Sequence, residues 1–274
     1  MPVLVSDAQR VALVTGVSRR AGIGFAITRQ LLAQGCCVFA TGWAHHDAEM
    51  AWGSDHGTDD DLLASLDGEA RVAYRQIDLS DPAAPASLVD GAIEFFGALD
   101  IVVANHARSS HHGLHELSVG ELDRCWAINA RASLLLVKAL AERHDDRRPD
   151  GRAVLFTSGQ HLAPMPDELA YAVSKGAVHQ MTASLADALA DRAITVNCVN
   201  PGPVDTGWAT GAVHQRVEAQ FPTRRWGRPE DVARLVAWLV SAEAAWITGQ
   251  VINSEGGYRR WARLPARSGV DGQS

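Results

Sequence analysis

The sequence is poor in lysine and tyrosine and has no excess of positive charge. Two of its 25 basic residues are lysines, Lys138 and Lys175, and only three tyrosines occur among 274 residues. The formal net charge is −7, and the arginines are scattered along the chain. Because a phosphate backbone or an anionic membrane surface attracts clustered positive charge, we expect neither nucleic acid nor a membrane as a partner.

Long apolar runs and cysteine motifs are also lacking. No run approaches the roughly 18 apolar residues of a membrane helix, and the first residues do not form a basic segment followed by an apolar one. No Cys-x-x-Cys spacing occurs, which indicates buried free thiols in a reducing compartment at Cys36, Cys37, Cys125 and Cys198. These absences predict a soluble, cytoplasmic protein.

The hydrophobic residues, 47% of the chain, fall into two alternating patterns. Short β-branched runs alternate with longer amphipathic segments, which is typical of parallel strands joined by crossover helices. We predict an α/β fold with a seven-stranded parallel sheet flanked by helices on both faces, forming one domain over 1–262 with a frayed tail at 263–274. The predicted strands are 11–15, 37–41, 72–77, 99–104, 153–157, 194–199 and 251–253, and the main predicted helices are 23–35, 83–96, 119–141, 171–189 and 229–240.

A glycine-rich loop links the first predicted strand to the first predicted helix. It consists of Thr15-Gly16-Val17-Ser18-Arg19-Arg20-Ala21-Gly22-Ile23-Gly24. Glycines let the backbone turn sharply and approach a pyrophosphate, and the helix N-terminus offers that anion unpaired N–H groups. The loop therefore predicts a dinucleotide site. The alternative is a tight turn that only packs the helix closely on the strand.

The residues near the adenosine ribose decide between NAD and NADP. A free 2′-hydroxyl is usually held by an acid at the end of the second strand, whereas a 2′-phosphate is held by cations. The second predicted strand ends at Thr41, Gly42 and Trp43 without an acid, and Arg19 and Arg20 lie in the glycine loop. We therefore expect NADP(H). The alternative is NAD(H), with both arginines merely exposed to solvent.

Tyr171 and Lys175 stand four positions apart in a predicted helix, so their side chains share one face. A phenol with a pKa near 10 is a poor proton carrier at neutral pH, but a nearby ammonium lowers that pKa by stabilising the phenolate. The pair therefore predicts a general acid or base. Ser158, at the end of the fifth strand, could hold a substrate oxygen. Asn129 could support the lysine through a water, although a helical asparagine is also a common packing device.

Together these features resemble the short-chain dehydrogenase/reductase family, in its compact single-domain form with a Rossmann-type doubly wound sheet, over about residues 8–257. The family motif Thr-Gly-x-x-x-Gly-x-Gly corresponds to Thr15, Gly16, Gly22 and Gly24, and the family's catalytic residues correspond to Asn129, Ser158, Tyr171 and Lys175. The resemblance implies further cofactor contacts at Ser18, Arg19, Arg20, Ile23, Trp43, Asp78, Leu79, Asn105, Pro201, Gly202, Val204 and Thr206.

The resemblance implies an NAD(P)-dependent oxidoreductase that interconverts a ketone and a secondary alcohol. Tyr171 would exchange the proton, and Ser158 would hold the substrate oxygen. Lys175 would bind the nicotinamide ribose and lower the pKa of Tyr171, and Asn129 would organise a water.

Segments 159–167 and 203–226 follow strands and would form the substrate pocket, with contacts from Gln160, His161 and Trp208. The long segment 42–70 resembles a subgroup described as 3-oxoacyl carrier-protein reductases, which favours a small ketone or 3-oxoacyl substrate. A sugar or polyol dehydrogenase is the alternative within the family. A non-catalytic NADP-binding sensor is the alternative of another class.

Two departures from the family pattern stand out. The glycine loop has two extra residues, and the usual Asn-Asn-Ala-Gly is replaced by Ala104-Asn105-His106-Ala107. We interpret His106 as a packed or exposed histidine, the alternative being a contact with cofactor or substrate. The histidines at 111, 112 and 115 are interpreted as an exposed loop with no metal bound. The resemblance also implies a homotetramer, or a homodimer, formed through the helices at 119–141 and 171–189.

Overall fold

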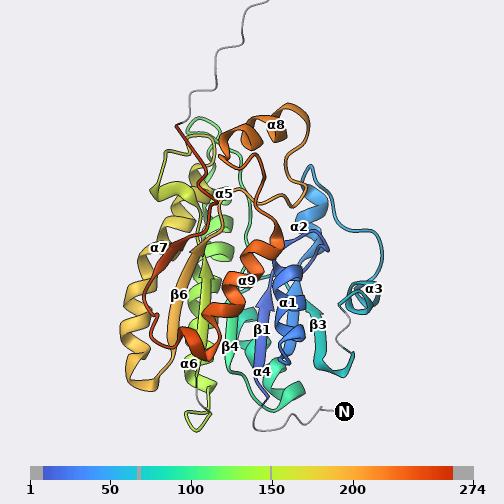
Figure 1. Cartoon of the computed structure of the whole chain (residues 1–274), viewed down its shortest axis with the longest axis vertical. Coiled ribbons are helices and arrows are strands. Elements are labelled where there is room, and N and C mark those ends of the chain that lie inside the picture. The colour runs from blue at the N-terminus through green and yellow to red at the C-terminus, as the bar shows by residue number, and fades with distance from the viewer. Residues whose placement is uncertain (1–8, 67–68, 149, 262–274) are drawn as a thin grey trace, which may run out of the picture.

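Seven parallel strands form one sheet in the computed structural model, which describes residues 9–66, 69–148 and 150–261 (Figure 1). The strands are β1 (Val11–Thr15), β2 (Cys37–Gly42), β3 (Val72–Gln76), β4 (Ile101–Ala104), β5 (Arg152–Phe156), β6 (Thr195–Asn200) and β7 (Val251–Asn253). Their spatial order is β3-β2-β1-β4-β5-β6-β7. The predicted doubly wound, seven-stranded α/β architecture is therefore confirmed.

Helices cover both faces of this sheet. One face carries α4 (Ala84–Phe96), α6 (Ala132–Arg143) and α7 (Leu169–Leu189), and the other carries α1 (Ile23–Ala33) and α9 (Pro229–Leu239). Beyond the carboxyl ends of the strands lies α8 (Gly211–Gln220), at the top of Figure 1. The remaining α-helices are short: α2 (Ala44–Glu49), α3 (Asp59–Ala64) and α5 (Val119–Cys125).

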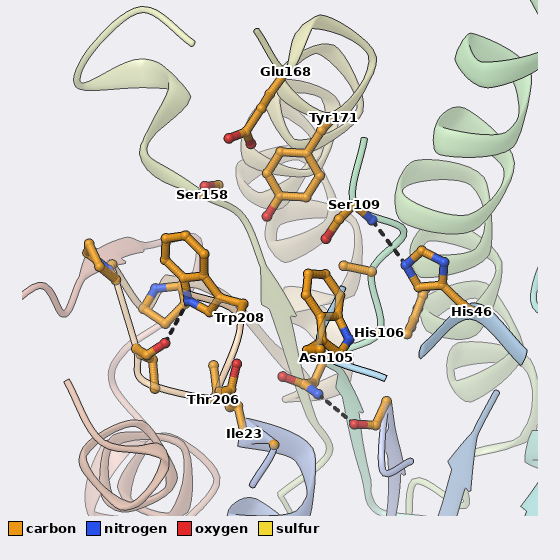
Figure 2. A pocket seen from close by; sticks show the side chains of 18 of the residues that line it. Ile23, His46, Asn105, His106, Ser109, Ser158, Glu168, Tyr171, Thr206 and Trp208 are labelled. Carbon is orange, nitrogen blue, oxygen red and sulfur yellow. Dashed lines mark hydrogen bonds between the residues drawn. The ribbon is translucent and has the colours of Figure 1, made fainter. Parts of the chain in front are cut away.

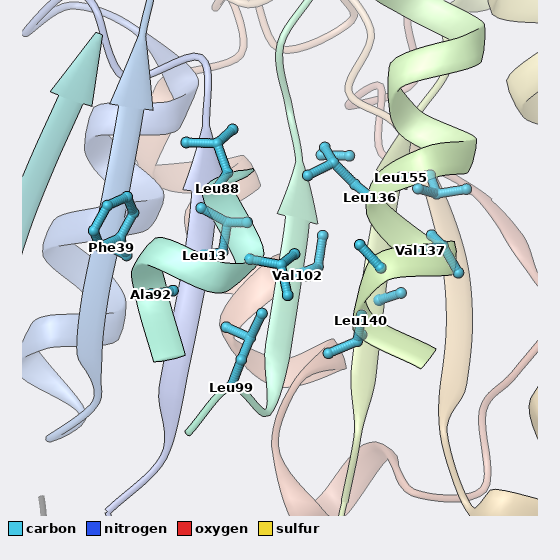
Figure 3. Packing of buried hydrophobic residues seen from close by; sticks show 14 of the residues in the cluster. Leu13, Phe39, Leu88, Ala92, Leu99, Val102, Leu136, Val137, Leu140 and Leu155 are labelled. Atoms are coloured by element: carbon cyan, nitrogen blue, oxygen red, sulfur yellow. The ribbon is translucent and has the colours of Figure 1, made fainter. Parts of the chain in front are cut away.

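Each inner strand is buried on both faces, which explains its nearly continuous apolar sequence. In β1, Leu13 packs into the layer beneath α4 and α6, whereas Val14 packs into the layer beneath α1 and α9. Figure 3 shows the first layer, where Leu88 of α4 and Leu136 of α6 lie over the sheet. The two layers hold the strands rigidly, so their carboxyl ends are fixed platforms for loops.

The structure divides one predicted helix. The segment 119–141 consists of α5, a π-helical turn η2 (Trp126–Arg131) and α6. The apolar pattern predicted one continuous helix, and the π-helical turn within it became apparent only from the backbone hydrogen bonds. Segment 42–70 contains α2 and α3, and the capping box of Thr58 and Asp61 starts α3. The predicted tail 263–274 lies outside the described residues.

The order of the strands reverses between β1 and β4, whose connections leave the sheet in opposite directions. Ligands of open α/β sheets bind in the crevice that such a reversal creates beyond the carboxyl ends of the strands. The loops after β1, β2, β4, β5 and β6 all reach this crevice. Across the described helices, none combines the length and the apolarity needed to span a membrane.

Candidate active site

A cavity of about 650 Å³ lies over the reversal point of the sheet. Gly16 and Ser18 line it from the loop after β1, Asn105 from the loop after β4, Ser158 from the loop after β5 and Thr206 from the loop after β6. Figure 2 shows Ile23, Asn105 and Thr206 around one part of this space and Ser158 and Tyr171 around another. The cavity is thus lined by loops that follow four strands, so a ligand bound in it can contact all of them.

The glycine loop is built for a close backbone approach. Gly16 has φ +74°, a conformation that favours glycine, and Gly24 begins α1 directly against it. A Cβ added at Gly24 would lie 2.8 Å from the Asn105 Nδ2 and closer still to the Gly16 carbonyl oxygen. The N-cap of α1, Gly22, has no side-chain cap, and the first turn carries no acid. This helix N-terminus therefore presents N–H groups and a positive dipole to an anion.

An acidic residue lies in the helix after β2, although the strand itself ends without one. Asp47 of α2 is buried and borders the cavity. Its carboxylate accepts hydrogen bonds from the Ser18 hydroxyl at 2.5 Å and from the Trp52 indole N–H at 3.0 Å. Its sequence position, five residues beyond β2, gave no signal, because only the fold of α2 returns it to the glycine loop.

The two arginines of the glycine loop point in different directions. The Arg20 backbone N–H donates to Asp55 at 2.7 Å, and its guanidinium pairs with the same carboxylate at 3.4 Å, away from the cavity. Arg19 instead reaches the Thr206 carbonyl oxygen and lies over the ring of Trp52, 5.6 Å from the ring centroid. Of the two, Arg19 borders the cavity.

Tyr171 and Lys175 lie on one face of α7, beside Ser158. The Lys175 ammonium is buried and donates to the Phe156 carbonyl oxygen at 2.9 Å, and it lies 5.8 Å from the centroid of the Tyr171 ring. Figure 2 shows the Tyr171 hydroxyl and Ser158 facing the same space. Ser158 favours the ionised form of this tyrosine. The Tyr171 phenol and the Ser158 alcohol thus border one end of the cavity, whereas the buried Lys175 ammonium lies outside its lining.

Burial dominates the ionisation of this group. Burial raises the pKa of Tyr171 to about 12. Ser158 acts in the opposite direction, because it favours the phenolate, but its effect is smaller. Burial likewise lowers the pKa of Lys175 to about 8. The net pKa shift of Tyr171 is therefore opposite to the lowering that we expected from Lys175, because burial is its largest cause. Tyr171 is therefore a protonated phenol at neutral pH.

Asn129 lies in the π-helical turn and does not border the cavity. Its Oδ1 accepts the Arg108 backbone N–H at 2.7 Å, and its amide donates to the Arg108 carbonyl at 3.0 Å and to the Ser174 hydroxyl at 2.9 Å. Both amide hydrogens are therefore used within the protein. Asn129 ties the loop after β4 to α7, directly beside Lys175.

His106 is buried at the base of the cavity, as a packed histidine. Its Nδ1 lies 2.7 Å from the Thr15 hydroxyl, and its Nε2 lies 2.9 Å from the Ile128 carbonyl oxygen in the π-helical turn. Burial lowers its pKa to about 3, and the positive charge of Lys175 acts in the same direction. The ring is therefore neutral and connects β1 to the turn that holds Asn129.

Several predicted contacts take other positions in the structure. Gln160 folds back, accepting the Ser158 backbone N–H at 3.2 Å and donating to the Thr157 hydroxyl at 3.0 Å. His161 is exposed and packs on His179, with ring centroids 4.6 Å apart. The cavity lining excludes these two residues and also Arg20, Gly24, Asp78, Asn129 and Lys175. It includes the other predicted residues: Gly16, Ser18, Arg19, Gly22, Ile23, Trp43, Leu79, Asn105, Ser158, Tyr171, Pro201, Gly202, Val204, Thr206 and Trp208.

The substrate end contains residues that the sequence analysis missed. Glu168 borders the cavity beside Tyr171 (Figure 2), and burial raises the pKa of its carboxyl group. The sequence could have indicated Glu168, because it stands three residues before Tyr171 and residues three apart lie on the same side of a helix. Tyr258, Arg260 and Trp261 reach the same cavity from the chain beyond β7, where no local pattern indicates a site.

The histidines after β4 do not form a metal site in the part of the chain that the structure describes. His111 lies 3.8 Å from the Glu168 carboxylate, and the ring of His112 lies 3.3 Å from the Ser110 hydroxyl. No three His, Cys, Asp or Glu side chains within the described ranges converge as metal ligands. The His111 contact connects the loop after β4 to the start of α7, and the His112 contact lies within that loop.

Comparisons with known proteins agree with this geometry. The chain matches the family model described as enoyl-(acyl carrier protein) reductase over residues 16–259. It is 39% identical to uncharacterized oxidoreductase YjdA of Bacillus subtilis over 92% of this chain and 98% of that protein. It is 29% identical to glucose 1-dehydrogenase 2 of the same species, over 90% and 94% of the two chains. A solved short-chain dehydrogenase/reductase of Serratia marcescens superposes with a TM-score of 0.79 at 31% identity, over 92% of this chain and 99% of that one.

The doubly wound sheet and the glycine cradle define a dinucleotide-binding oxidoreductase. The chain belongs to the short-chain dehydrogenase/reductase family. Members use a nicotinamide dinucleotide, and the cavity with a glycine loop at one end and Tyr171 at the other fits such a group. The predicted resemblance is confirmed.

The contact between Gly16 and Gly24 leads to a first prediction. We expect Gly24→Ala to weaken dinucleotide binding at least about tenfold and to lower the melting temperature, because its Cβ must displace the glycine loop. Gly120→Ala is the matched control, since Gly120 also lies in a helix and its Cβ would meet open space. Calorimetric titration and thermal denaturation measure both effects. Unchanged affinity in Gly24→Ala would show that the loop does not cradle the dinucleotide.

Proposed function

We propose that this protein interconverts a small ketone and the corresponding secondary alcohol, with Tyr171 as the proton donor or acceptor. The observation that carries the proposal is the juxtaposition of the Tyr171 hydroxyl and Ser158 at the end of the dinucleotide cavity. The nicotinamide, when bound, supplies or accepts the hydride. Ser158 holds the carbonyl oxygen, and Tyr171 delivers its proton to that oxygen or removes one from the alcohol.

The supporting residues position this pair. Lys175 provides positive charge beneath the tyrosine and would meet the nicotinamide ribose, as the family resemblance implies. The contacts of Asn129 support a positioning role, because its amide hydrogens hold Arg108 and Ser174. Gly16, Gly22 and Ile23 would hold the diphosphate, and Asn105 fixes the start of this loop by donating to the Thr15 carbonyl oxygen at 3.1 Å.

For the cofactor, the local charges support NAD(H) over the NADP(H) that the sequence analysis favoured. Asp47 directs a buried carboxylate to the side of the cavity nearest β2, where the adenosine ribose of a dinucleotide binds. A ribose hydroxyl can donate to this carboxylate, whereas a 2′-phosphate would be repelled by it. Arg20 is already paired with Asp55, and Arg19 extends to Thr206 on the far side of β1.

Two substrate classes suit different parts of the cavity. Trp208, Tyr258 and Trp261 provide the apolar surface that a small ketone or a 3-oxoacyl group requires. A sugar or polyol is the second candidate, because the Glu168 carboxylate beside Tyr171 can accept hydrogen bonds from neighbouring hydroxyls. The name of the relative glucose 1-dehydrogenase 2 supports this second class.

The exposed face of α5, η2 and α7 supports the homotetramer or homodimer implied by the family resemblance. Val119, Trp126 and Val173 are 75%, 51% and 60% exposed on these elements. Exposed large apolar side chains on neighbouring elements are a common feature of subunit interfaces. We propose this face as the contact between subunits.

The proton role of Tyr171 is tested by Tyr171→Phe. We expect turnover to fall at least about 100-fold, because the variant has no hydroxyl to donate, while dinucleotide affinity stays within a factor of about two. Dinucleotide oxidation is followed across ketones, 3-oxoacyl thioesters, sugars and polyols, and affinity is measured by calorimetric titration. Retained turnover in Tyr171→Phe would remove the tyrosine from the reaction. A wild-type protein that binds dinucleotide and turns over none of these compounds would favour a sensor.

The pH dependence follows from the buried lysine. Below a pKa of about 8 Lys175 carries the positive charge that favours negative charge on Tyr171 as its proton leaves, and above it that charge is lost. We therefore expect kcat/KM for carbonyl reduction to fall as the pH rises through about 8. Lys138→Met is the control, because Lys138 is the exposed second lysine and its loss should leave the profile unchanged. A profile that is flat from pH 7 to pH 10 contradicts this expectation.

The choice of cofactor is tested by Asp47→Asn. We expect the wild type to bind NADH at least tenfold more tightly than NADPH, and the variant to lose about tenfold in NADH affinity while gaining affinity for NADPH. Asp60→Asn is the control, because Asp60 is exposed on α3. Tighter binding of NADPH by the wild type would restore the NADP(H) expectation and reject this role of Asp47.

A further inference from the structure

Arg19 spans the cavity between two loops that the sheet order places apart. It leaves the loop after β1, and its guanidinium donates to the Thr206 carbonyl oxygen in the loop after β6. Between β1 and β6 lie β4 and β5. Gly207 adjoins the contact, and a Cβ added there would lie 3.8 Å from the guanidinium. The side chain is therefore a strap over the middle of the cavity.

The strap is held from a second direction by Trp52. The indole ring lies beneath the Arg19 guanidinium at 5.6 Å, and its N–H donates to Asp47 at 3.0 Å. Because Asp47 also accepts from Ser18, the ring is fixed to the same glycine loop that carries Arg19. A guanidinium stacked on an aromatic ring retains its N–H groups in the ring plane for other acceptors.

Within the part of the chain that the structure describes, no acidic side chain neutralises the charge of Arg19. No carboxylate of residues 9–66, 69–148 or 150–261 lies within ion-pair distance of its guanidinium, in contrast to the Arg20 pair with Asp55. Arg19 also directly precedes the N-terminus of α1, where the Gly22 N–H donates to the Arg19 carbonyl oxygen at 2.9 Å. The backbone of Arg19 therefore lies at a helix N-terminus that has no acid in its first turn.

We propose that Arg19 is a latch that closes over the diphosphate of the bound dinucleotide. This inference rests on the proposed function, since it assigns a residue to the same cofactor. The guanidinium has five N–H donors, and the Thr206 carbonyl uses part of them, so donors remain for phosphate oxygens. The two extra residues of the glycine loop supply the length of chain that brings Arg19 over the cavity. Opening the contact with Thr206 frees the path for cofactor exchange.

The latch differs from a 2′-phosphate contact in what it recognises. A group that binds the diphosphate acts equally on NADH, NADPH and ADP-ribose, because all three contain it. A group that binds the 2′-phosphate acts on NADPH alone. Adenosine lacks both groups and reports only on the adenine and ribose contacts.

The experiment measures the affinities of NADH, NADPH, ADP-ribose and adenosine by calorimetric titration for the wild type, Arg19→Gln and Arg19→Lys. We expect Arg19→Gln to weaken the first three ligands by the same factor, about 10- to 100-fold, and to leave adenosine unchanged. The slope of log Kd against log salt concentration should become shallower in Arg19→Gln and stay near wild type in Arg19→Lys, which keeps the charge. Arg29→Gln, exposed on α1, is the control for net charge.

Each of the following results would reject the proposed role of Arg19. A loss confined to NADPH assigns Arg19 to the 2′-phosphate, and unchanged affinities show that it only joins two loops. An equal loss in Arg19→Gln and Arg19→Lys, without a change in the salt slope, indicates a loop displaced by either substitution. If the wild-type protein binds none of the dinucleotides, the proposed function itself is refuted. The wild-type titration alone shows this outcome, so it cannot be confused with a failure of the Arg19 proposal.

Discussion

The buried ammonium of Lys175 is the contact on which the arrangement of the active site depends. It donates to the Phe156 carbonyl oxygen at the last residue of β5, and so fixes α7 against the end of the sheet. Thr157 strengthens the same junction by donating its hydroxyl to the Lys175 carbonyl oxygen at 2.9 Å. Ser158 follows in the chain, and Tyr171 lies one helical turn before the lysine. The two groups that would hold the substrate oxygen are therefore positioned by one helix–strand contact.

A second set of contacts surrounds this junction. Asn129 attaches the loop after β4 to Ser174, the residue before Lys175, and His106 attaches the π-helical turn to Thr15 at the end of β1. The π-helical turn explains why the Ile128 carbonyl is available to a side chain, because its wider ladder changes the pairing of the backbone. The ends of β1, β4 and β5 are thus connected beneath the cavity by buried polar side chains. Such satisfied networks make a site rigid.

The sequence predicts those parts of the site that depend on short spacing. Tyr171 and Lys175 share a helix face because they are one turn apart, and the glycine loop lies between a strand and a helix that are adjacent in the chain. Asp47 could not be predicted, since it reaches Ser18 only after α2 folds back from β2. The inward fold of Gln160 was equally hidden, because a polar side chain in a loop can satisfy its own backbone instead of facing a ligand.

Burial is the other property that spacing does not reveal. Helical periodicity places an ammonium near a phenol, but the depth of the pair below the surface decides its ionisation. Here burial raises the pKa of Tyr171 and lowers that of Lys175, so the phenol is neutral in the free protein. The directions of Arg19 and Arg20 also depend on tertiary partners, Thr206 for one and Asp55 for the other.

The most direct test of the central claim is a crystal structure of the protein with NADH bound. We expect the nicotinamide ring to lie beside the Tyr171 hydroxyl and Ser158, with Lys175 still anchored at the end of β5. A complex in which the ring lies elsewhere, or in which the Tyr171 hydroxyl is turned away from it, would contradict the proposed reaction.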